Sequence, residues 1–194
     1  MDAALQHILL GCKENERTAQ KALYDRYCNL FMSICLRYVE SKAEAEEALH
    51  NAFLRIFKHI NKYTGQGSFE GWMKKIVVNC CLTYISKAGY QAKTKIISIQ
   101  TGNSIAYGGI LDIEDSCSPE DKHDKEYLLY LLQNLPETTR LVFNLYVFEE
   151  YNHAEIAEIL SIAERTSQSH LAKARKILSA ELDKKKLMSK MLRV

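Results

Sequence analysis

Apolar residues recur every three or four positions through most of this chain, the spacing that gives an α-helix one apolar face. In the first half, three such stripes follow one another, over about 19–38, 45–60 and 69–84. Ser41 separates the first two stripes and Ser68 precedes the third, and serine is a favoured N-cap residue. No segment alternates with period two for long enough to indicate a sheet. The pattern therefore predicts an all-α fold.

The helical pattern stops between about Lys87 and Pro119, in a segment that holds four of the eight glycines. A structureless run of this length is unusual inside one compact domain. We leave open short strand-like turns around 96–99. The pattern predicts two small helical domains joined by a flexible linker, with the first domain, the linker and the second domain at 1–86, 87–121 and 122–194.

The last part of the chain has the pattern of a helix-turn-helix. Pro136 interrupts the apolar spacing, which resumes over 141–148, and Asn152 is a candidate N-cap. We expect a short helix, a turn and a longer helix at 153–160, 161–163 and about 164–182. In a DNA-binding helix-turn-helix the second helix enters the major groove, although helical hairpins that bind nothing have the same outline.

Charge is distributed unevenly along a nearly neutral chain. The formal net charge is +2. Nine bases face two acids in the segment 165–194, seven acids face two bases in 110–126, and 40–47 holds a further acidic cluster. The basic segment coincides with the second helix of the helix-turn-helix, which favours DNA as its ligand. For any single charged run, a solvated helix surface is the alternative.

Chemistry that would indicate an enzyme is absent from the motifs. The six cysteines form no CxxC pair and most lie in apolar helical stretches, which fits reduced thiols in the cytoplasm better than a disulfide framework or a zinc site. No phosphate-binding glycine loop, HExxH or GxSxG motif occurs. The N-terminus is neither a signal peptide nor a membrane span. We therefore expect no catalytic residue, no metal, no cofactor and no membrane insertion.

Five motifs together resemble the extracytoplasmic-function (ECF) group of bacterial sigma factors, and the resemblance covers about Leu5 to Leu182. Each motif is modest, but their order and their separation by a linker make a strong joint signal. They are AEEALHNAFL at 45–54, SFEGWMKKIVVN at 68–79, LPETTRLVF at 135–143, EIAEIL at 155–160 and TSQSHLAKAR at 166–175.

The resemblance implies a transcription initiation factor that binds core RNA polymerase and directs it to promoters. The first domain would be of the sigma region 2 type, and would bind the −10 element and open the strands. The second would be of the region 4 type and would read the −35 element. An anti-sigma factor is a further implied partner.

The resemblance also assigns residues to each contact. The helix over 45–53 would dock on the polymerase, and acidic side chains there can meet a basic partner surface. The residues expected to bind core polymerase are Glu44, Glu46, Glu47 and His50. An exposed acidic helix face without a partner is the plainer interpretation.

Strand opening needs a place for an unpaired base, which aromatic and basic side chains provide. The resemblance places this site at the loop 62–69 and the helix after it. Trp72 also fits a core position, and Tyr63 and Asn79 are the stronger contact candidates. The residues expected at the −10 element are Tyr63, Phe69, Trp72, Lys74, Lys75, Asn79 and Lys87.

For the −35 element, glutamine can pair with adenine and lysine can reach guanine, whereas other polar groups set the register on the backbone. Gln168, Ser169 and Lys173 are expected at bases or nearby phosphate, and Ala172 at a thymine methyl. The full set expected at the −35 element is Arg165, Thr166, Gln168, Ser169, Ala172, Lys173 and Arg175.

The chain departs from the family pattern at several positions. Ser161 and Glu150 stand where the family often has glycine, and Ala163 stands where it often has serine. His50 and Asn51 replace a common glutamine and acid, and Lys87 lies near a usual arginine. The acidic linker residues can mimic phosphate or only tether; they are Asp112, Glu114, Asp115, Glu120 and Asp121.

Two other functions remain as alternatives. A helix-turn-helix regulator would bind duplex DNA without polymerase, as a dimer, and the chain shows no dimer heptads. A helical adaptor would show little dependence on salt when mixed with DNA, whereas phosphate contacts give a steep one.

Overall fold

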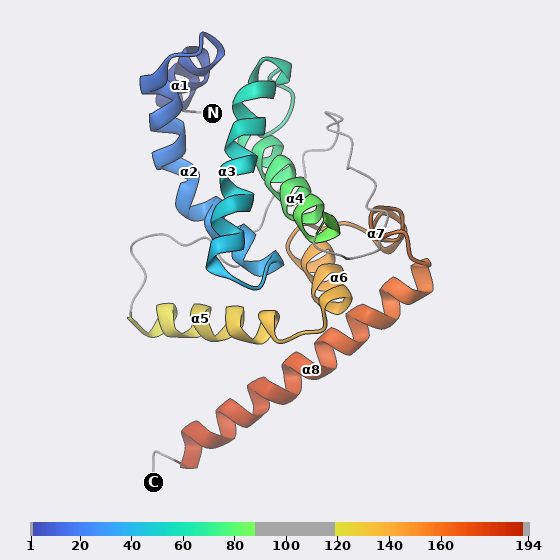
Figure 1. The fold of residues 1–194 in the computed structure, drawn as a ribbon. Coiled ribbons are helices and arrows are strands. Elements are labelled where there is room, and N and C mark those ends of the chain that lie inside the picture. The colour runs from blue at the N-terminus through green and yellow to red at the C-terminus, as the bar shows by residue number, and fades with distance from the viewer. Residues whose placement is uncertain (1, 88–118, 192–194) are drawn as a thin grey trace. The chain divides into compact units, whose positions relative to one another are not determined.

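The computed structural model describes residues 2–87 and 119–191, and every regular element in these two ranges is helical (Figure 1). The chain divides into two compact units, residues 1–114 and 115–194, which we call the first and second unit. The predicted all-α, two-domain fold is confirmed. Most of the expected linker lies outside the described residues, as do the possible strand turns at 96–99 and the linker acids Asp112, Glu114 and Asp115, whereas Glu120 and Asp121 lie in the first turn of α5 (Pro119–Gln133).

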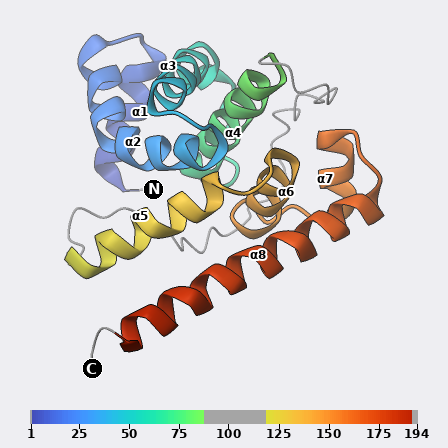
Figure 2. The same ribbon diagram turned by 60° about the horizontal axis from the view of Figure 1, so that its bottom comes forward.

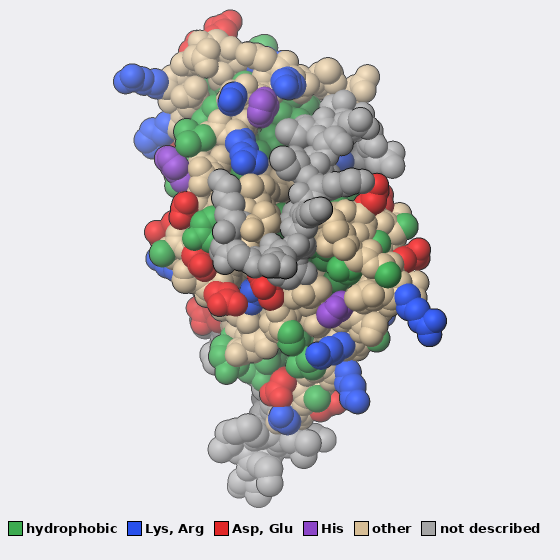
Figure 3. Space-filling view, turned by 45° about the vertical axis from the view of Figure 1, so that its right-hand side comes forward, with side chains coloured by type: hydrophobic (Ala, Val, Ile, Leu, Met, Phe, Trp, Pro, Cys, Tyr) green, Lys and Arg blue, Asp and Glu red, His purple; other side chains and the backbone are tan. Residues whose placement is uncertain are grey.

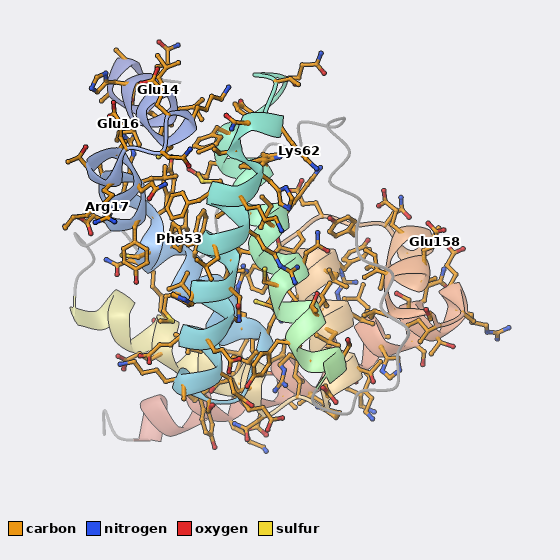
Figure 4. The ribbon with its side chains drawn as sticks, turned by 45° about the horizontal axis from the view of Figure 1, so that its top comes forward. Glu14, Glu16, Arg17, Phe53, Lys62 and Glu158 are labelled. Atoms are coloured by element: carbon orange, nitrogen blue, oxygen red, sulfur yellow. The ribbon has the colours of Figure 1, made fainter. Side chains whose placement is uncertain are left out.

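In its described residues, 2–87, the first unit is a bundle of four helices and one 3-10 turn (Figure 2). Helices α2, α3 and α4 pack against one another, and α1 packs on α2. Phe53 of α3 points toward α2, where its ring lies 4.7 Å from Tyr24 and 5.6 Å from Phe31 between centroids (Figure 4). The elements are α1 (Ala3–Lys13), α2 (Arg17–Tyr38), α3 (Lys42–His59), η1 (Ile60–Lys62) and α4 (Phe69–Lys87).

Helix starts in the first unit are fixed by the residues that the sequence indicates. The Ser41 side chain accepts from the Glu44 amide, and the Glu44 carboxylate accepts from the Ser41 amide at 2.9 Å, which completes a capping box. The Ser68 hydroxyl accepts from the Gly71 amide at 3.2 Å. Both caps agree with the prediction. The sequence interpretation did not include α1, whose N-cap is Asp2.

Over residues 119–191, the part that the structure describes, the second unit contains four helices with a shared apolar core. Leu131, Leu132 and Leu135 pack with Ala174 and Leu178, so the first and last helices enclose one cluster. The elements are α5 (Pro119–Gln133), α6 (Glu137–Val147), α7 (His153–Leu160) and α8 (Glu164–Met191). Helix α5 begins inside the expected linker, and α4 continues through Lys87 at its other end. Helix α8 runs well past the expected end near Leu182, because no glycine or proline follows to stop it.

Helices α7 and α8 form the predicted helix-turn-helix. The Asn152 side chain accepts from the Glu155 amide at 2.9 Å and caps α7. Ser161 ends α7 with φ 54° and ψ 45°, the left-handed conformation that favours glycine. Glu150 also has positive φ, 57°. The two positions where the resemblance led us to expect glycine are therefore the two left-handed residues of this region, and both carry side chains.

Candidate nucleic-acid interface

The candidate DNA-reading residues of α8 lie on an exposed surface. Spacing of three and four residues places Arg165, Gln168, Ala172 and Arg175 close together along the helix. All seven residues expected at the −35 element are exposed. The structure thus gathers this predicted set on an accessible surface, where side chains can reach base edges and phosphates without rearrangement.

The buried side of α8 is held by both packing and polar contacts. Leu171 is buried among the other helices of the unit. The Ser167 hydroxyl, fully buried, lies 2.9 Å from His153 Nδ1 of α7. The Thr139 hydroxyl of α6 lies 3.0 Å from His170 Nδ1. These contacts fix the rotation of α8, and so decide which of its side chains face outward.

The environment of His170 changes its acidity. Burial, and to a smaller extent the charge of Lys173, lowers the pKa of the His170 imidazole below its usual value of 6.5. The neutral ring is therefore favoured at this contact. Sequence reasoning missed this residue because a histidine in a helical stripe carries no sign of its partner on another helix.

The aromatic residues expected at the −10 element form a closed cluster. Ring centroids of Tyr63, Phe69 and Trp72 lie 5.0–5.8 Å apart. The Tyr63 hydroxyl donates to the Gly67 carbonyl at 2.7 Å, which closes the loop between η1 and α4. Gly65 and Gly67 provide positive φ in that loop. The cluster therefore anchors the loop to the bundle.

Burial does not separate the contact candidates in this cluster from its core residues. Tyr63, Trp72 and Asn79 are 4%, 6% and 5% exposed. The expectation that Tyr63 and Asn79 are more available than Trp72 finds no support in these values. Their contact with DNA stays a prediction, and it requires the side chains to become accessible. Within the described ranges, the buried Trp72 Nε1–H has no hydrogen-bond acceptor.

The lysines of this region differ in their accessibility. Lys74 is buried and its ammonium lies 2.8 Å from the Glu70 carboxylate. Lys75 is half-buried, and Lys87 is the last residue of α4, its side chain outside the described part. Lys74 must therefore exchange a carboxylate for a phosphate before it can contact DNA.

A basic cluster at the end of α3 was not among the predicted site residues. Burial, together with the nearby charges of Lys62, Lys58 and Arg55, lowers the pKa of His59. Lys62 lies at the end of the bundle from which the loop to α4 departs (Figure 4). Figure 3 shows positively charged side chains beside a histidine at this end of the first unit. The spacing of the bases at the end of the stripe, three and four residues apart, was the available signal.

The candidate polymerase-binding residues on α3 are not equivalent. Glu46, Glu47 and His50 are exposed. Glu44 is half-buried, and its carboxylate also accepts from the Glu40 amide at 3.2 Å in addition to its capping-box bond. Glu44 therefore stabilises the start of α3, whereas the other three are exposed and only Glu46 among them has an ion-pair partner in the described residues, Lys42 at 3.8 Å.

A groove of about 320 Å³ runs between α3 and α4 beside Glu47. Burial, followed by the charges of Glu47 and Glu44, raises the pKa of Tyr84. Burial also raises the pKa of the Cys80 thiol to about 11, so this cysteine stays protonated and is a poor nucleophile. The residues lining the groove are Glu47, Ala48, Asn51, Arg55, Cys80, Thr83 and Tyr84.

Metal-ligand clusters and membrane-spanning helices are both absent from the described residues. No group of three or more metal-ligating side chains comes together in 2–87 and 119–191. In the same ranges no helix is both long and apolar enough to cross a bilayer.

Comparison with known proteins assigns both units. Residues 23–90 match sigma-70 region 2, and residues 125–178 match sigma-70 region 4. The ECF RNA polymerase sigma-E factor of Haemophilus influenzae is 22% identical over 181 residues, which cover 91% of this chain and 94% of that protein. The sigma-E factor of Escherichia coli K12 is 23% identical over 170 residues, covering 86% and 87%.

Solved structures give a weaker likeness. The sigma factor RpoE from Bartonella quintana, crystallised with the anti-sigma factor NepR, is 16% identical with a TM-score of 0.48, and the match covers 84% of this chain and 96% of that one. CnrH, solved with the cytosolic domain of CnrY, is 14% identical with the same TM-score, covering 91% and 95%.

The chain belongs to the sigma-70 family, because its first unit carries region 2 and its second unit carries region 4 in the order of that family. Within the family it is a sigma factor of the ECF group, and it directs RNA polymerase in the initiation of transcription.

Proposed function

We propose that the exposed surface of α8 reads the −35 element of the promoter. The observation that carries this proposal is the exposure of all seven candidate residues on a helix whose opposite side is fixed by Ser167 and Leu171. Gln168 reads a base edge, because its amide offers a donor and an acceptor. In the free chain that amide makes only a 3.5 Å contact with Glu164, which a base can replace at little cost.

We propose a different mode for the −10 element. The cluster of Tyr63, Phe69 and Trp72 opens locally at the loop 64–68 and accepts an unpaired base. The Trp72 indole N–H supports this role, since a base oxygen would supply the acceptor that the described chain does not. Arg55, Lys58 and Lys62 at the end of α3 are suited to the phosphates of the separated strand.

We propose that the exposed acids of α3 contact core polymerase. Glu46→Lys and Glu47→Lys each reverse a charge on accessible surface, so they weaken binding to core polymerase and leave folding intact. Glu14→Lys, an exposed reversal just after α1, is the matched control and leaves binding unchanged (Figure 4). Glu44 is unsuitable for this comparison because its removal also breaks the capping box.

The proposal includes the setting in which the protein works. We infer that it acts in the cytoplasm and carries out no covalent chemistry, since polymerase supplies the catalysis. An anti-sigma factor is proposed as a regulatory partner, as the sequence resemblance implies.

Run-off transcription tests the proposal as a whole. Purified core polymerase is incubated with a genomic library, with and without the full chain. New start sites that share two upstream elements are expected only when the chain is present. Tight binding of the chain to duplex DNA without polymerase, with no new start sites, would favour the regulator instead.

A further inference from the structure

Three side chains from three helices stack next to the DNA-reading surface of the second unit. The guanidinium carbon of Arg175 in α8 lies 5.8 Å from the ring centroid of Tyr146 in α6. The Tyr146 ring stacks on His153 of α7, with centroids 4.7 Å apart and planes 24° apart. His153 Nδ1 lies 2.9 Å from the Ser167 hydroxyl of α8, so this series of contacts begins and ends on α8.

A cation over an aromatic face keeps its donors available. The attraction acts through the ring face, within about 6 Å of the centroid. The five N–H groups of arginine point outward in the plane of the guanidinium, and they match the oxygens of a phosphate. Tyr146 can therefore restrict the Arg175 side chain without occupying the groups that would bind DNA.

Arg26 also lies over a tyrosine ring, and it differs from Arg175 in the pairing of its charge. Arg26 lies 5.9 Å from the Tyr27 ring, but it also donates to the Asp2 carboxylate at 2.7 Å. Its charge is thus already paired. In the described part of the chain, no carboxylate forms an ion pair with the exposed Arg175.

We infer that Tyr146 is a positioning residue that holds Arg175 ready for a phosphate oxygen of promoter DNA, and that His153 and Ser167 hold Tyr146. The inference rests on the proposed reading of the −35 element by α8. It adds a residue of α6 that does not belong to the exposed surface and that no motif singled out.

The test uses polymerase holoenzyme containing the full chain, on a promoter fragment recovered from the run-off selection. Binding is measured over a series of KCl concentrations. Arg175→Ala should make the slope of log affinity against log salt shallower by about 0.9, the value for one lost phosphate contact. Lys184→Ala, an exposed base of α8 about 24 Å along the axis from Gln168, is the control for loss of charge alone, and its slope should stay that of the wild type.

Substitutions of Tyr146 separate positioning from packing. Tyr146→Leu should weaken binding about three-fold, the typical strength of an exposed cation–π contact, whereas Tyr146→Phe keeps the ring and should bind as the wild type does. In the Arg175→Ala background, Tyr146→Leu should have no further effect. Tyr130→Leu, an exposed tyrosine on α5 of the same unit, should change nothing.

Two outcomes overturn the inference while leaving the proposed function in place. In the first, Tyr146→Leu weakens binding equally with and without Arg175, which would indicate a structural role. In the second, Arg175→Ala changes the slope but Tyr146→Leu has no effect. If Arg175→Ala itself behaves as the wild type, the phosphate contact and the inference both fail. Should Tyr146→Leu fold poorly in thermal melting, Tyr146→Met provides the same comparison with an unbranched side chain.

Discussion

The two units present their candidate DNA contacts in opposite ways. In the second unit all seven candidates are exposed on α8, whereas in the first unit Tyr63, Phe69, Trp72 and Asn79 are all buried. Duplex DNA can be read by side chains that already face outward. Capturing an unpaired base requires an apolar surface, which a free protein covers in its own core. In the free protein these aromatic residues therefore stabilise the first unit. They can bind an unpaired base only after they become exposed.

The largest effect on stability is expected from substituting Trp72, which is both a candidate DNA contact and a buried core residue. Trp72→Ala removes a buried ring that stacks on Phe69, and should lower the free energy of unfolding of the first unit by about 3–5 kcal/mol. Urea unfolding followed by circular dichroism measures this. Trp72→Phe keeps a ring in the stack and should lose less. A loss below about 1 kcal/mol would show that the cluster is not the packed core described here.

Substitution of Gln168 should change promoter recognition and leave stability unchanged, the reverse of what is expected for Trp72. Gln168→Ala should leave unfolding unchanged within about 0.5 kcal/mol, because the side chain is exposed. It should reduce discrimination at one promoter position by about 1–3 kcal/mol. Gel shifts of holoenzyme over a set of −35 variants measure this, with Lys173→Ala as a control that weakens all sequences alike. An unchanged preference profile for Gln168→Ala would reject base reading.

A smaller effect is expected at the turn before α8. Ser161→Gly should stabilise the second unit by about 1 kcal/mol, because glycine adopts the left-handed conformation without the side-chain clash. Ala157→Gly inside α7 is the matched control and should destabilise by about the same amount. Thermal melting of both variants checks the signs, and a destabilising Ser161→Gly would show that the serine side chain is needed in the turn.

The smallest effect should be a dependence on pH. Because the pKa of His170 is lowered in the folded chain, the unfolded chain takes up the proton first as the pH falls below about 6.5. The contribution of His170 to stability is therefore complete above that pH and is lost progressively below it. His170→Gln should reduce the slope of stability between pH 7.5 and 5. Equal slopes for the two proteins would contradict the assignment.

Local features of the fold were predictable because they depend on neighbours in the sequence. Ser41, Ser68 and Asn152 cap their helices as expected, since a cap needs only the amides that follow within three residues. The apolar stripes likewise identified α2, α3 and α4. Helix α1 was not predicted. It packs closely on α2: a Cβ added at Gly11 would lie 2.7 Å from the Ala19 Cβ.

Features that depend on distant partners were not predictable. Periodicity placed Trp72 and Phe69 on one face, but it cannot show that the Tyr63 hydroxyl closes the loop on Gly67. The contact of Tyr146 with Arg175 joins two helices separated by a third, and no spacing in the sequence encodes it.

The length of α8 changes what its positive charge can do. The helix has 28 residues and rises about 42 Å along its axis, more than one turn of duplex DNA. Lys184 lies sixteen residues beyond Gln168, an axial offset of about 24 Å, and it is engaged with Glu181. The basic residues of this segment are therefore spread along the length of the helix. Only the basic residues of its first turns lie close enough to Gln168 to share the phosphates that flank the bases it would read.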